Sequence, residues 1–190
     1  MTKVVNLSIH EASAAAQNKL TCLIRPVKNQ PSKCHLLATD VMSPSGYSWI
    51  ADAYHDVYVQ TFANPGDILI CRETWAFLNH FGTGELRIAW KADLDEIWYG
   101  PWLSSVRLPK VKARHHFIVK SMRVCRADEL AMDEIIGAGY EGGCSVAEAE
   151  CIQCEHIMPK CRNLYFRYFT HHWKLDLDAW VAVAEIERRG

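Results

Sequence analysis

Short β-rich segments, separated by turn signals and interrupted by few helices, recur along the whole chain. Five of them combine strand-forming residues with apolar patterning, and they lie near residues 22–27, 67–73, 86–91, 115–125 and 179–187. Short strands with few helices are typical of the α+β class. The sequence therefore predicts an α+β fold in which these five strands pair into a small, closed β-barrel with flanking helices.

Helix and loop signals separate these segments. Ser8 and Glu11 have the spacing of a capping box, which predicts a short helix ending near Asn18. Asp128 is expected to cap a second helix that glycines close near residue 139. A third helix is expected at 162–173. Pro, Ser, Lys and Gly in residues 29–48 indicate a loop, and residues 53–62 carry strand-forming side chains.

The composition is that of an ordinary globular protein. The chain has 190 residues, of which 49% are hydrophobic and 23% are charged, and this balance argues against disorder. No apolar run approaches the roughly 20 residues of a membrane span, so no membrane partner is expected. The first residues lack the apolar core of a signal peptide. We therefore expect a cytoplasmic protein, in a compartment where disulfides are rare.

The charges are unevenly distributed along a chain whose net charge is only −1. Residues 101–126 hold seven Lys or Arg and no acid, whereas residues 127–158 hold eight acids and no Lys or Arg. Two interpretations stay open at this point. The two segments are either solvated faces that happen to differ, or a basic groove for phosphate beside an acidic flap.

Half of the eight cysteines form a cluster with the spacing C-x6-C-x2-C-x6-C. A Cys-x2-Cys pair places two thiolates on one tetrahedral metal, and a second pair completes the site. We expect a structural zinc, with free thiols or a disulfide formed on handling as alternatives. Its ligands would be Cys144, Cys151, Cys154 and Cys161, with His156 as a substitute. The scattered cysteines Cys22, Cys71 and Cys125 are expected to be small core residues.

Residues 64–75, NPGDILICRETW, place four notable side chains directly after a short apolar strand. A turn signal opens the segment, and its end carries Arg72, Glu73, Thr74 and Trp75. A hydrophobic core needs none of the polar groups, which indicates a site. An indole stacks on a nucleobase, and a guanidinium and a carboxylate hydrogen-bond to base edges or to each other. The alternatives are a core tryptophan and a structural ion pair between Arg72 and Glu73.

The order of these segments resembles the phage and prophage branch of the ASCH-domain proteins, which have a PUA-like β-barrel. The segments that carry the resemblance are NKLTCLIRPVK (18–28), PGDILICRETW (65–75), AWKAD (89–93), SSVRLPKVKAR (104–114), ADELAMDEIIGAGY (127–140) and a terminal Trp–strand–Glu–Arg segment (180–188). The resemblance implies a single ASCH/PUA-like domain over residues 1–190, with a cysteine-bearing insertion at about 141–161. It also implies a phage or prophage accessory protein.

In PUA-like barrels the Gly-Asp turn and its strand border a cleft that faces RNA or a modified nucleobase. The resemblance therefore implies that the chain binds RNA or a modified nucleotide in a basic cleft. Seven residues from three segments are expected to converge there: Arg25, Arg72, Glu73, Trp75, Ser105, Lys110 and Arg114. Strand alternation predicts that Glu73 and Trp75 share one face, with Arg72 and Thr74 on the other.

Some bacterial ASCH proteins are amidohydrolases that remove an acyl group from N4-acetylcytidine, using a Lys-Thr-x-Thr-x-Arg motif and a later glutamate. Aligning Arg25 with the motif's arginine puts Leu20 and Leu23 at its lysine and second threonine, and Ala138 at the glutamate. Leucine can neither transfer a proton nor attack a carbonyl, so a binding module is favoured over an enzyme. In the alternative of a small amidohydrolase, the catalytic residues would be Lys19, Thr21 and Glu73.

A third hypothesis concerns the cysteine cluster and the acidic segment that contains it. A zinc-stabilised module would bind a protein partner through residues 127–158. Turnover of N4-acetylcytidine would identify the hydrolase. Salt-dependent RNA binding would separate a nucleic-acid module from a protein-binding one.

Overall fold

The computed structural model describes residues 1–28, 30, 37–42, 47–51, 56–79, 86–93, 101–140, 166 and 169–189. Within these ranges the fold is mixed α+β, which confirms the expected class. A five-stranded sheet, a three-stranded sheet and a two-stranded hairpin accompany two α-helices. None of the described helices is both long and apolar enough to cross a membrane.

The elements follow one another in this order along the chain: β1 (Thr2–Asn6), α1 (Ile9–Ala16), β2 (Cys22–Pro26), β3 (Leu37–Met42), β4 (Tyr47–Ala51), β5 (Asp56–Gln60), β6 (Ile68–Arg72), β7 (Trp75–Asn79), β8 (Leu86–Trp90), β9 (His115–Arg126), α2 (Met132–Gly137) and β10 (Trp180–Arg188). Short 3₁₀ turns cover Lys91–Asp93, Ser105–Arg107, Lys110–Lys112 and Ala127–Glu129, and Phe169–Trp173 form a π-helical turn.

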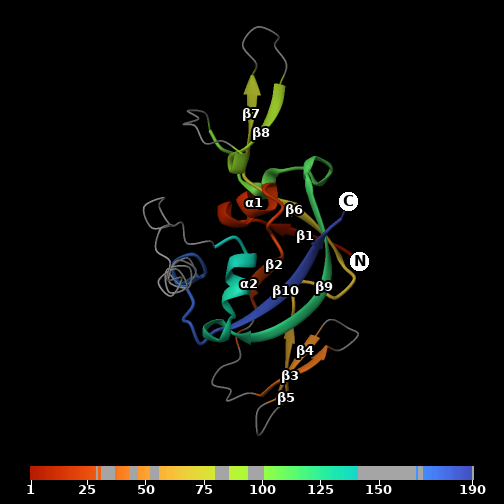
Figure 1. Ribbon diagram of the computed structural model, residues 1–190, viewed down its shortest axis with the longest axis vertical. Coiled ribbons are helices and arrows are strands. Elements are labelled where there is room, and N and C mark those ends of the chain that lie inside the picture. The colour runs from red at the N-terminus through yellow and green to blue at the C-terminus, as the bar shows by residue number, and fades with distance from the viewer. Residues whose placement is uncertain are drawn as a thin grey trace, which may run out of the picture.

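The central sheet has the strand order β1-β6-β9-β10-β2 (Figure 1). Strand β1 runs parallel to β6, whereas the other neighbours are antiparallel. Both faces of the sheet are packed. One hydrophobic cluster includes Leu23, Phe117 and the alanines of α1, and another includes Val181 and Ile135 of α2. Because both faces are covered, both alternating sets of side chains in most of β10 are apolar.

The prediction of a closed barrel is wrong for the described residues. Strands β2, β6, β9 and β10 do share one sheet, but β8 pairs with β7 in a separate hairpin. No backbone pairing joins the edge strands β1 and β2 within the described ranges. Instead, a side chain spans them, since Arg25 of β2 donates to the carbonyl oxygen of Asn6 in β1 at 2.9 Å. An arginine therefore stands where a closed barrel would have a strand ladder.

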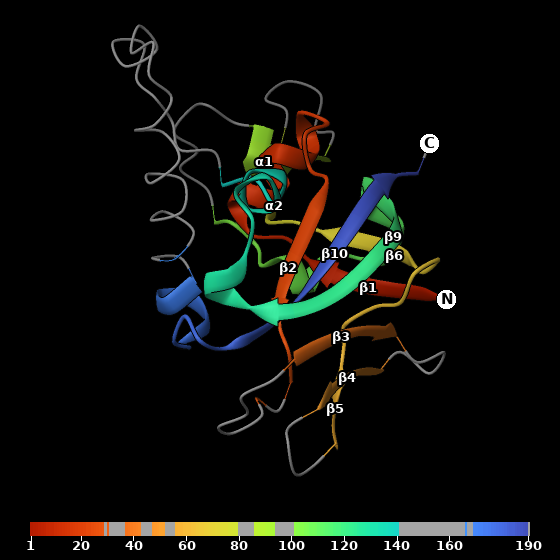
Figure 2. The same cartoon turned by 60° about the horizontal axis from the view of Figure 1, so that its bottom comes forward.

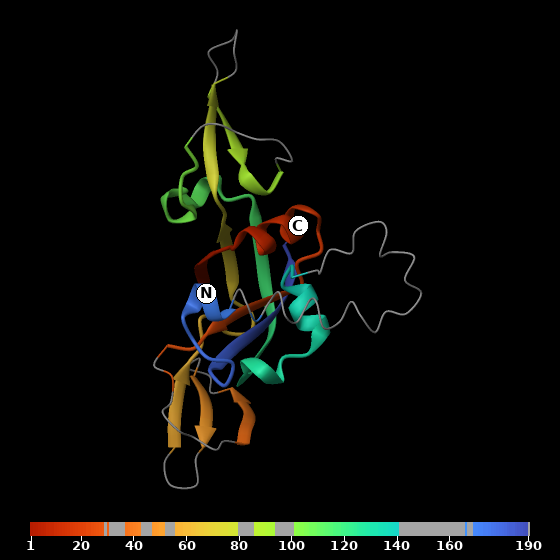
Figure 3. The ribbon, with the colours of Figure 1, turned by 90° about the vertical axis from the view of Figure 1, so that its left-hand side faces the viewer.

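Two small β-units project from the central sheet. The hairpin β7–β8 extends from one end of the molecule, and the sheet β3-β4-β5 lies at the opposite end (Figure 3). The expected loop at 29–48 is therefore wrong in part, because β3 and the start of β4 lie within it.

The helix starts are confirmed at α1 and differ at α2. Ser8 and Glu11 form the predicted capping box, with each side chain accepting from the other's backbone nitrogen, and Asn18 leaves the helix with a φ of 59°. Asp128 does not cap α2. It lies in a 3₁₀ turn, and the helix begins after Ala131, whose nitrogen donates to Glu134 at 2.9 Å. Both helices lie toward the same end of the sheet (Figure 2).

Candidate functional site

The segment 64–75 turns, forms a strand and then changes direction. Gly66 supplies the left-handed conformation of the turn with a φ of 84°, and the Asp67 carboxylate accepts from the nitrogen of Asn64. Strand β6 ends at Arg72 and β7 begins at Trp75, so strand alternation does not run through the residues between them. This break leaves Glu73 free to point away from the Trp75 cluster described below.

Glu73 is a buried carboxylate, 1% exposed, held by two residues from the start of β9 and the segment before it. Arg114 donates from Nε and Nη2 to its two oxygens at 2.7 and 3.0 Å. The Nε2 atom of His115 lies 3.3 Å from Glu73 Oε1. Burial alone would raise the pKa of Glu73, but these contacts from His115 and Arg114 outweigh it and hold the pKa below its ordinary value.

Arg114 also binds a second carboxylate. Its Nη1 and Nη2 atoms donate to Asp93 at 2.5 and 2.6 Å, and its guanidinium lies 5.0 Å from the centre of the Trp90 ring. Burial lowers the pKa of Arg114, yet Glu73 and Asp93 together raise it above its ordinary value. With two carboxylates on one guanidinium, Arg114 holds three chain segments together and has little capacity left to bind a phosphate.

Trp75 lies in a small hydrophobic cluster beside this network. It is 5% exposed and packs with Leu108 and Ala113, while partly buried side chains surround them: Ile70, Ile88, Trp90 and Leu103. The backbones of Trp75 and Leu103 exchange two hydrogen bonds. Trp75 thus fastens the segment 101–114 to the β7–β8 hairpin, and this burial favours packing as its main role.

Unsatisfied buried nitrogens are concentrated at this place. Among the described residues, six buried side-chain nitrogens have no hydrogen-bond partner, and five of them belong to adjoining ends of β6, β7 and β9. These five are Arg72 Nε, Trp75 Nε1, His115 Nδ1, His115 Nε2 and His116 Nε2. The contact of His115 Nε2 with Glu73 is therefore close in distance but lacks hydrogen-bond geometry. Buried polar groups are normally paired, so such a concentration points to a missing partner.

Three of the five nitrogens surround Ile70. His116 is the strand partner of Ile70, and Arg72 follows two residues later on the same face of β6. Ile70 itself packs against the Trp75 cluster. Arg72, Trp75 and His116 therefore share one side of the sheet, whereas Glu73 and His115 lie together on the other. Glu73 and Trp75 do not share the face that strand alternation predicted.

Five of the seven expected site residues lie at or next to the junction of β6, β7 and the segment 101–114, divided between the two sides just described. Arg72, Glu73, Trp75 and Arg114 form the contacts above, and Ser105 lies beside Val106, whose carbonyl accepts from Arg72 Nη1 at 2.8 Å. The ion pair considered between Arg72 and Glu73 is replaced by the pair of Glu73 with Arg114. The sixth residue, Lys110, is exposed on the same segment, 101–114.

Arg25 serves a different purpose from the one expected. Its guanidinium pairs with the buried Glu11 carboxylate of α1 at 2.5 Å and donates to the carbonyls of Ile24 and Asn6. Burial lowers the pKa of Arg25, but Glu11 more than compensates and raises it. Among the described residues, no hydrogen bond or ion pair joins Arg25 to the other expected site residues, and its hydrogen bonds fasten α1 between β1 and β2.

An exposed basic surface borders the Trp75 cluster. The segment from 104 to 112 carries three exposed cations, Arg107, Lys110 and Lys112, and two exposed valines, Val106 and Val111, which are 62% and 88% exposed. Phe77 of the neighbouring hairpin is 52% exposed and its ring contacts Trp75 edge-on. Exposed cations beside an exposed aromatic ring are suited to a flexible anionic chain.

Sequence reasoning missed three members of this network, namely Trp90, Asp93 and His116. The AWKAD motif that supplies the first two was noticed only for its resemblance to a family. The sequence offers no partner for either residue of the histidine pair 115–116. Sequence spacing does not predict the members of such a network. Its central pair, Glu73 and Arg114, is separated by 41 positions of sequence.

The residues of the alternative hydrolase do not gather in one place. Thr21 lines a pocket with Glu134, Lys19 lines a separate hollow with His10, and Glu73 is enclosed by Arg114 and His115. The three positions that depart from the family motif are core residues. Leu20, Leu23 and Ala138 are at most 4% exposed and belong to the two main hydrophobic clusters.

The four expected zinc ligands Cys144, Cys151, Cys154 and Cys161, together with His156, lie outside the described residues. Within the part of the chain that the structure describes, no three His, Cys, Asp or Glu side chains are placed to hold a metal ion. The other expectation is confirmed: Cys22, Cys71 and Cys125 are buried, and burial raises their pKa values to about 12, 12 and 11.

Comparison of the chain with protein-family models, with curated proteins and with solved structures finds no match.

Proposed function

We propose that this chain is a PUA-like module of the ASCH type that binds RNA or a modified nucleotide beside Arg72, Trp75 and His116. One observation carries the proposal: three buried nitrogens without partners, on Arg72, Trp75 and His116, lie on the same side of the adjoining ends of β6, β7 and β9. Leaving a buried polar group unpaired costs about 1–3 kcal/mol. The three on Arg72, Trp75 and His116 lie on one side of the sheet, where a polar ligand would complete their hydrogen bonds.

The chemistry of these groups defines what the ligand must offer. Arg72 Nε and Trp75 Nε1 are donors only, and His116 Nε2 either donates or accepts. The ligand must therefore carry at least two acceptors on a compact surface. The carbonyl oxygens and ring nitrogens of a nucleobase meet this requirement, and so do the acylated forms of its exocyclic amine.

The surface around the nitrogens supports a chain of nucleotides over an isolated base. Arg107, Lys110 and Lys112 are exposed on the segment that covers Trp75, and residues 101–126 contain no acid. Arg114, which was expected in the basic cleft, is not counted among the phosphate-binding residues, because Glu73 and Asp93 occupy its guanidinium. Lysines on a mobile stem contact successive phosphates without reading sequence.

The sheet gives the PUA-like proposal limited support. Four of the five strands expected for a barrel are neighbours in the order β6-β9-β10-β2, and the site lies at the end of β6 where the resemblance puts it. The hydrolase alternative has no comparable observation in its favour, because Lys19, Thr21 and Glu73 are in three different environments.

Filter binding of a single-stranded RNA pool at several salt concentrations tests the proposal. The double variant Lys110→Met/Lys112→Met should bind more weakly and lower the slope of log affinity against log salt by roughly 1.4, about 0.7 for each lost phosphate contact. Lys28 and Lys174 are also exposed but lie outside the 101–114 segment. The matched control, Lys28→Met/Lys174→Met, should keep the wild-type slope. Absent RNA binding, or equal slopes in both double variants, would contradict the proposal.

A further inference from the structure

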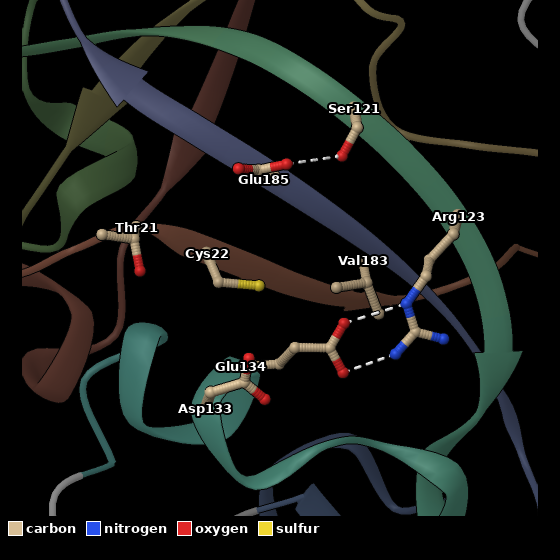
Figure 4. Close-up of a pocket in the computed structure, with 8 residues that line it drawn as sticks. All are labelled: Thr21, Cys22, Ser121, Arg123, Asp133, Glu134, Val183 and Glu185. Carbon is tan, nitrogen blue, oxygen red and sulfur yellow. Dashed lines mark hydrogen bonds and ion pairs between the residues drawn. The ribbon is translucent and has the colours of Figure 1, made fainter.

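A second concave site lies on the α2 side of the central sheet, away from the unsatisfied nitrogens. It is a pocket of about 450 Å³ bounded by α2 and by strands β2, β9 and β10 (Figure 4). That volume is typical of pockets that bind small molecules. None of the residues that line it belongs to the nucleotide site proposed above. A ligand in this pocket would therefore bind independently of the nucleotide site's residues.

The hollow follows from the way α2 is seated. At its C-terminal end the helix touches β2, where Thr21 donates its backbone N–H to the carbonyl of Gly137 at 2.9 Å. The approach is close, because a Cβ at position 137 would lie 2.4 Å from Thr21 Oγ1 and would force that side chain to move. At the other end of α2, Asp133 and Glu134 face the strands across the pocket (Figure 4).

The lining of the pocket is acidic. Three carboxylates, Asp133, Glu134 and Glu185, line it together with a single guanidinium, that of Arg123. Glu134 and Arg123 satisfy each other through two hydrogen bonds, one of them at 2.9 Å. Glu185 accepts one bond, from Ser121 at 3.0 Å, and Asp133 has no side-chain partner among the described residues. Two carboxylates therefore remain for a ligand, on opposite walls.

The floor between these carboxylates is apolar and holds an unpaired thiol. Cys22 is 5% exposed, its sulfur points into the pocket beside Val183, and it has no hydrogen-bond partner in the described part of the chain (Figure 4). Burial foremost, and then the nearby Glu134, raises the pKa of Cys22 to about 12, so the thiol stays neutral. A neutral floor between two anionic walls suits a ligand that is apolar in its middle.

A metal ion is a poorer occupant than an organic cation. Within the described residues, no three potential metal ligands come close enough to share one ion, although this pocket contains several carboxylates and a thiol. We propose that the pocket binds a linear diammonium cation of the diamine or polyamine class. One ammonium group pairs with Asp133, the other pairs with Glu185, and the methylene chain lies over Cys22 and Val183.

Calorimetric titration of the full chain with 1,4-diaminobutane at low salt tests this proposal. Asp133→Asn and Glu185→Gln should each weaken binding roughly fivefold or more, because each removes one of two charge contacts. Both residues are exposed, as is Asp176, which lies outside the pocket and serves as the charge-matched control in Asp176→Asn. Circular dichroism should show the same thermal unfolding for all four proteins.

Ligand variants complete the test. Butylamine, with one charge, should bind roughly tenfold more weakly than the diamine, and Mg²⁺ should not displace the diamine at equal concentration. The proposal is overturned if the wild-type protein shows no saturable binding of the diamine. It is equally overturned if Asp133→Asn and Glu185→Gln bind as well as Asp176→Asn, or if Mg²⁺ competes. RNA binding is measured separately, so either proposal can fail alone.

Discussion

Glu73 is the residue at the centre of the ion-pair network beside the candidate site. Its carboxylate is buried and contacts Arg114 and His115. The guanidinium of Arg114 also forms an ion pair with Asp93. The sequence marks Glu73 as out of place in a core, and the ion pair with the adjacent Arg72 that stayed open as an alternative is not the one that forms. Proximity in sequence is a poor guide here, because a strand end points successive side chains to different surroundings.

Replacement of Glu73 with Gln should destabilise the protein by about 2–4 kcal/mol, since Arg114 then keeps only its partly exposed contact with Asp93. Denaturant unfolding at neutral pH measures this loss. Asp176→Asn, which alters an exposed carboxylate, should change stability by less than about 0.5 kcal/mol. Equal stability of both variants would show that the buried pair contributes nothing.

The same variant should remove part of the acid dependence of stability. The folded-state pKa of Glu73 lies below its ordinary value of 4.5, so folding favours the carboxylate. The resulting stabilisation is fully present above about pH 4.5 and is lost as the pH falls through the lower, folded-state pKa. The stability gap between wild type and Glu73→Gln should therefore narrow as the pH falls below about 4.5 and through the folded-state pKa. A gap that stays constant over this range would contradict the assignment.

Trp75→Ala should lower stability by about 3–5 kcal/mol, because the indole is 5% exposed and fills the cluster with Leu108 and Ala113. If Trp75 also contacts the nucleotide, RNA affinity measured well below the new melting temperature should fall as well. Thermal unfolding and filter binding on the same preparation separate the two effects. A variant with wild-type melting temperature would contradict the packing role.

At the scale of elements, glycine decides how closely α1 and α2 approach. Gly139 ends α2 with a φ of 87°, and a Cβ there would lie 2.5 Å from the carbonyl oxygen of His10 in α1. Gly66 has a similar φ of 84° but open space around its Cβ position. A comparison of alanine substitutions at the two glycines therefore separates the free-energy cost of a left-handed backbone from the cost of the steric contact with α1.

Gly66→Ala should cost about 1 kcal/mol, the usual penalty of a left-handed alanine. Gly139→Ala should cost that amount and about 1–3 kcal/mol more, because His10 and α1 must move. Chemical denaturation of both variants provides the comparison. Equal losses would mean that the contact between α1 and α2 is loose.

Strong local signals predicted elements well, whereas long-range choices did not follow from them. The capping box of α1 and the apolar runs of β2, β6 and β9 were recognised because a few adjacent residues determine them. Strand β3 was mistaken for loop, because the turn residues around it are also frequent in loops. The partners of β8 depend on strands far away in sequence, and nothing local distinguishes a barrel strand from a hairpin strand.

At the scale of the whole molecule, the side chain of Arg25 links the two edge strands that a closed barrel would pair. Arg25 connects β2 to Asn6 of β1 and to Glu11 of α1, and residues of all three elements share one hydrophobic cluster. A basic residue after the first helix was expected to bind phosphate. Its burial beside a carboxylate instead makes it a structural residue, an outcome that composition and spacing cannot distinguish from a binding role.

The zinc expectation concerns the part of the chain between α2 and β10 and stays a prediction. Elemental analysis of protein purified without chelator should find one zinc per chain. Changing Cys151 and Cys154 together to serine should abolish it, whereas changing the buried Cys22 and Cys125 to alanine should not. Less than stoichiometric zinc in the wild-type protein would contradict the proposed site.

The central claim is that a nucleotide completes the hydrogen bonds of buried nitrogens beside Arg72, Trp75 and His116. The variant His116→Phe keeps an aromatic ring at this position and removes the unsatisfied nitrogen Nε2. The ligand-free variant should therefore be as stable as the wild-type protein or more stable. Its RNA affinity should fall roughly threefold to tenfold, the equivalent of one lost hydrogen bond. His171→Phe, at an exposed histidine, is the matched control.

Parallel measurement of RNA affinity and unfolding free energy on these two variants is the most direct test. The account predicts that His116→Phe loses affinity without losing stability, while His171→Phe retains both. An unchanged affinity in a fully folded His116→Phe protein would contradict it, because the unpaired nitrogens would then be a feature of the core with no ligand to satisfy them.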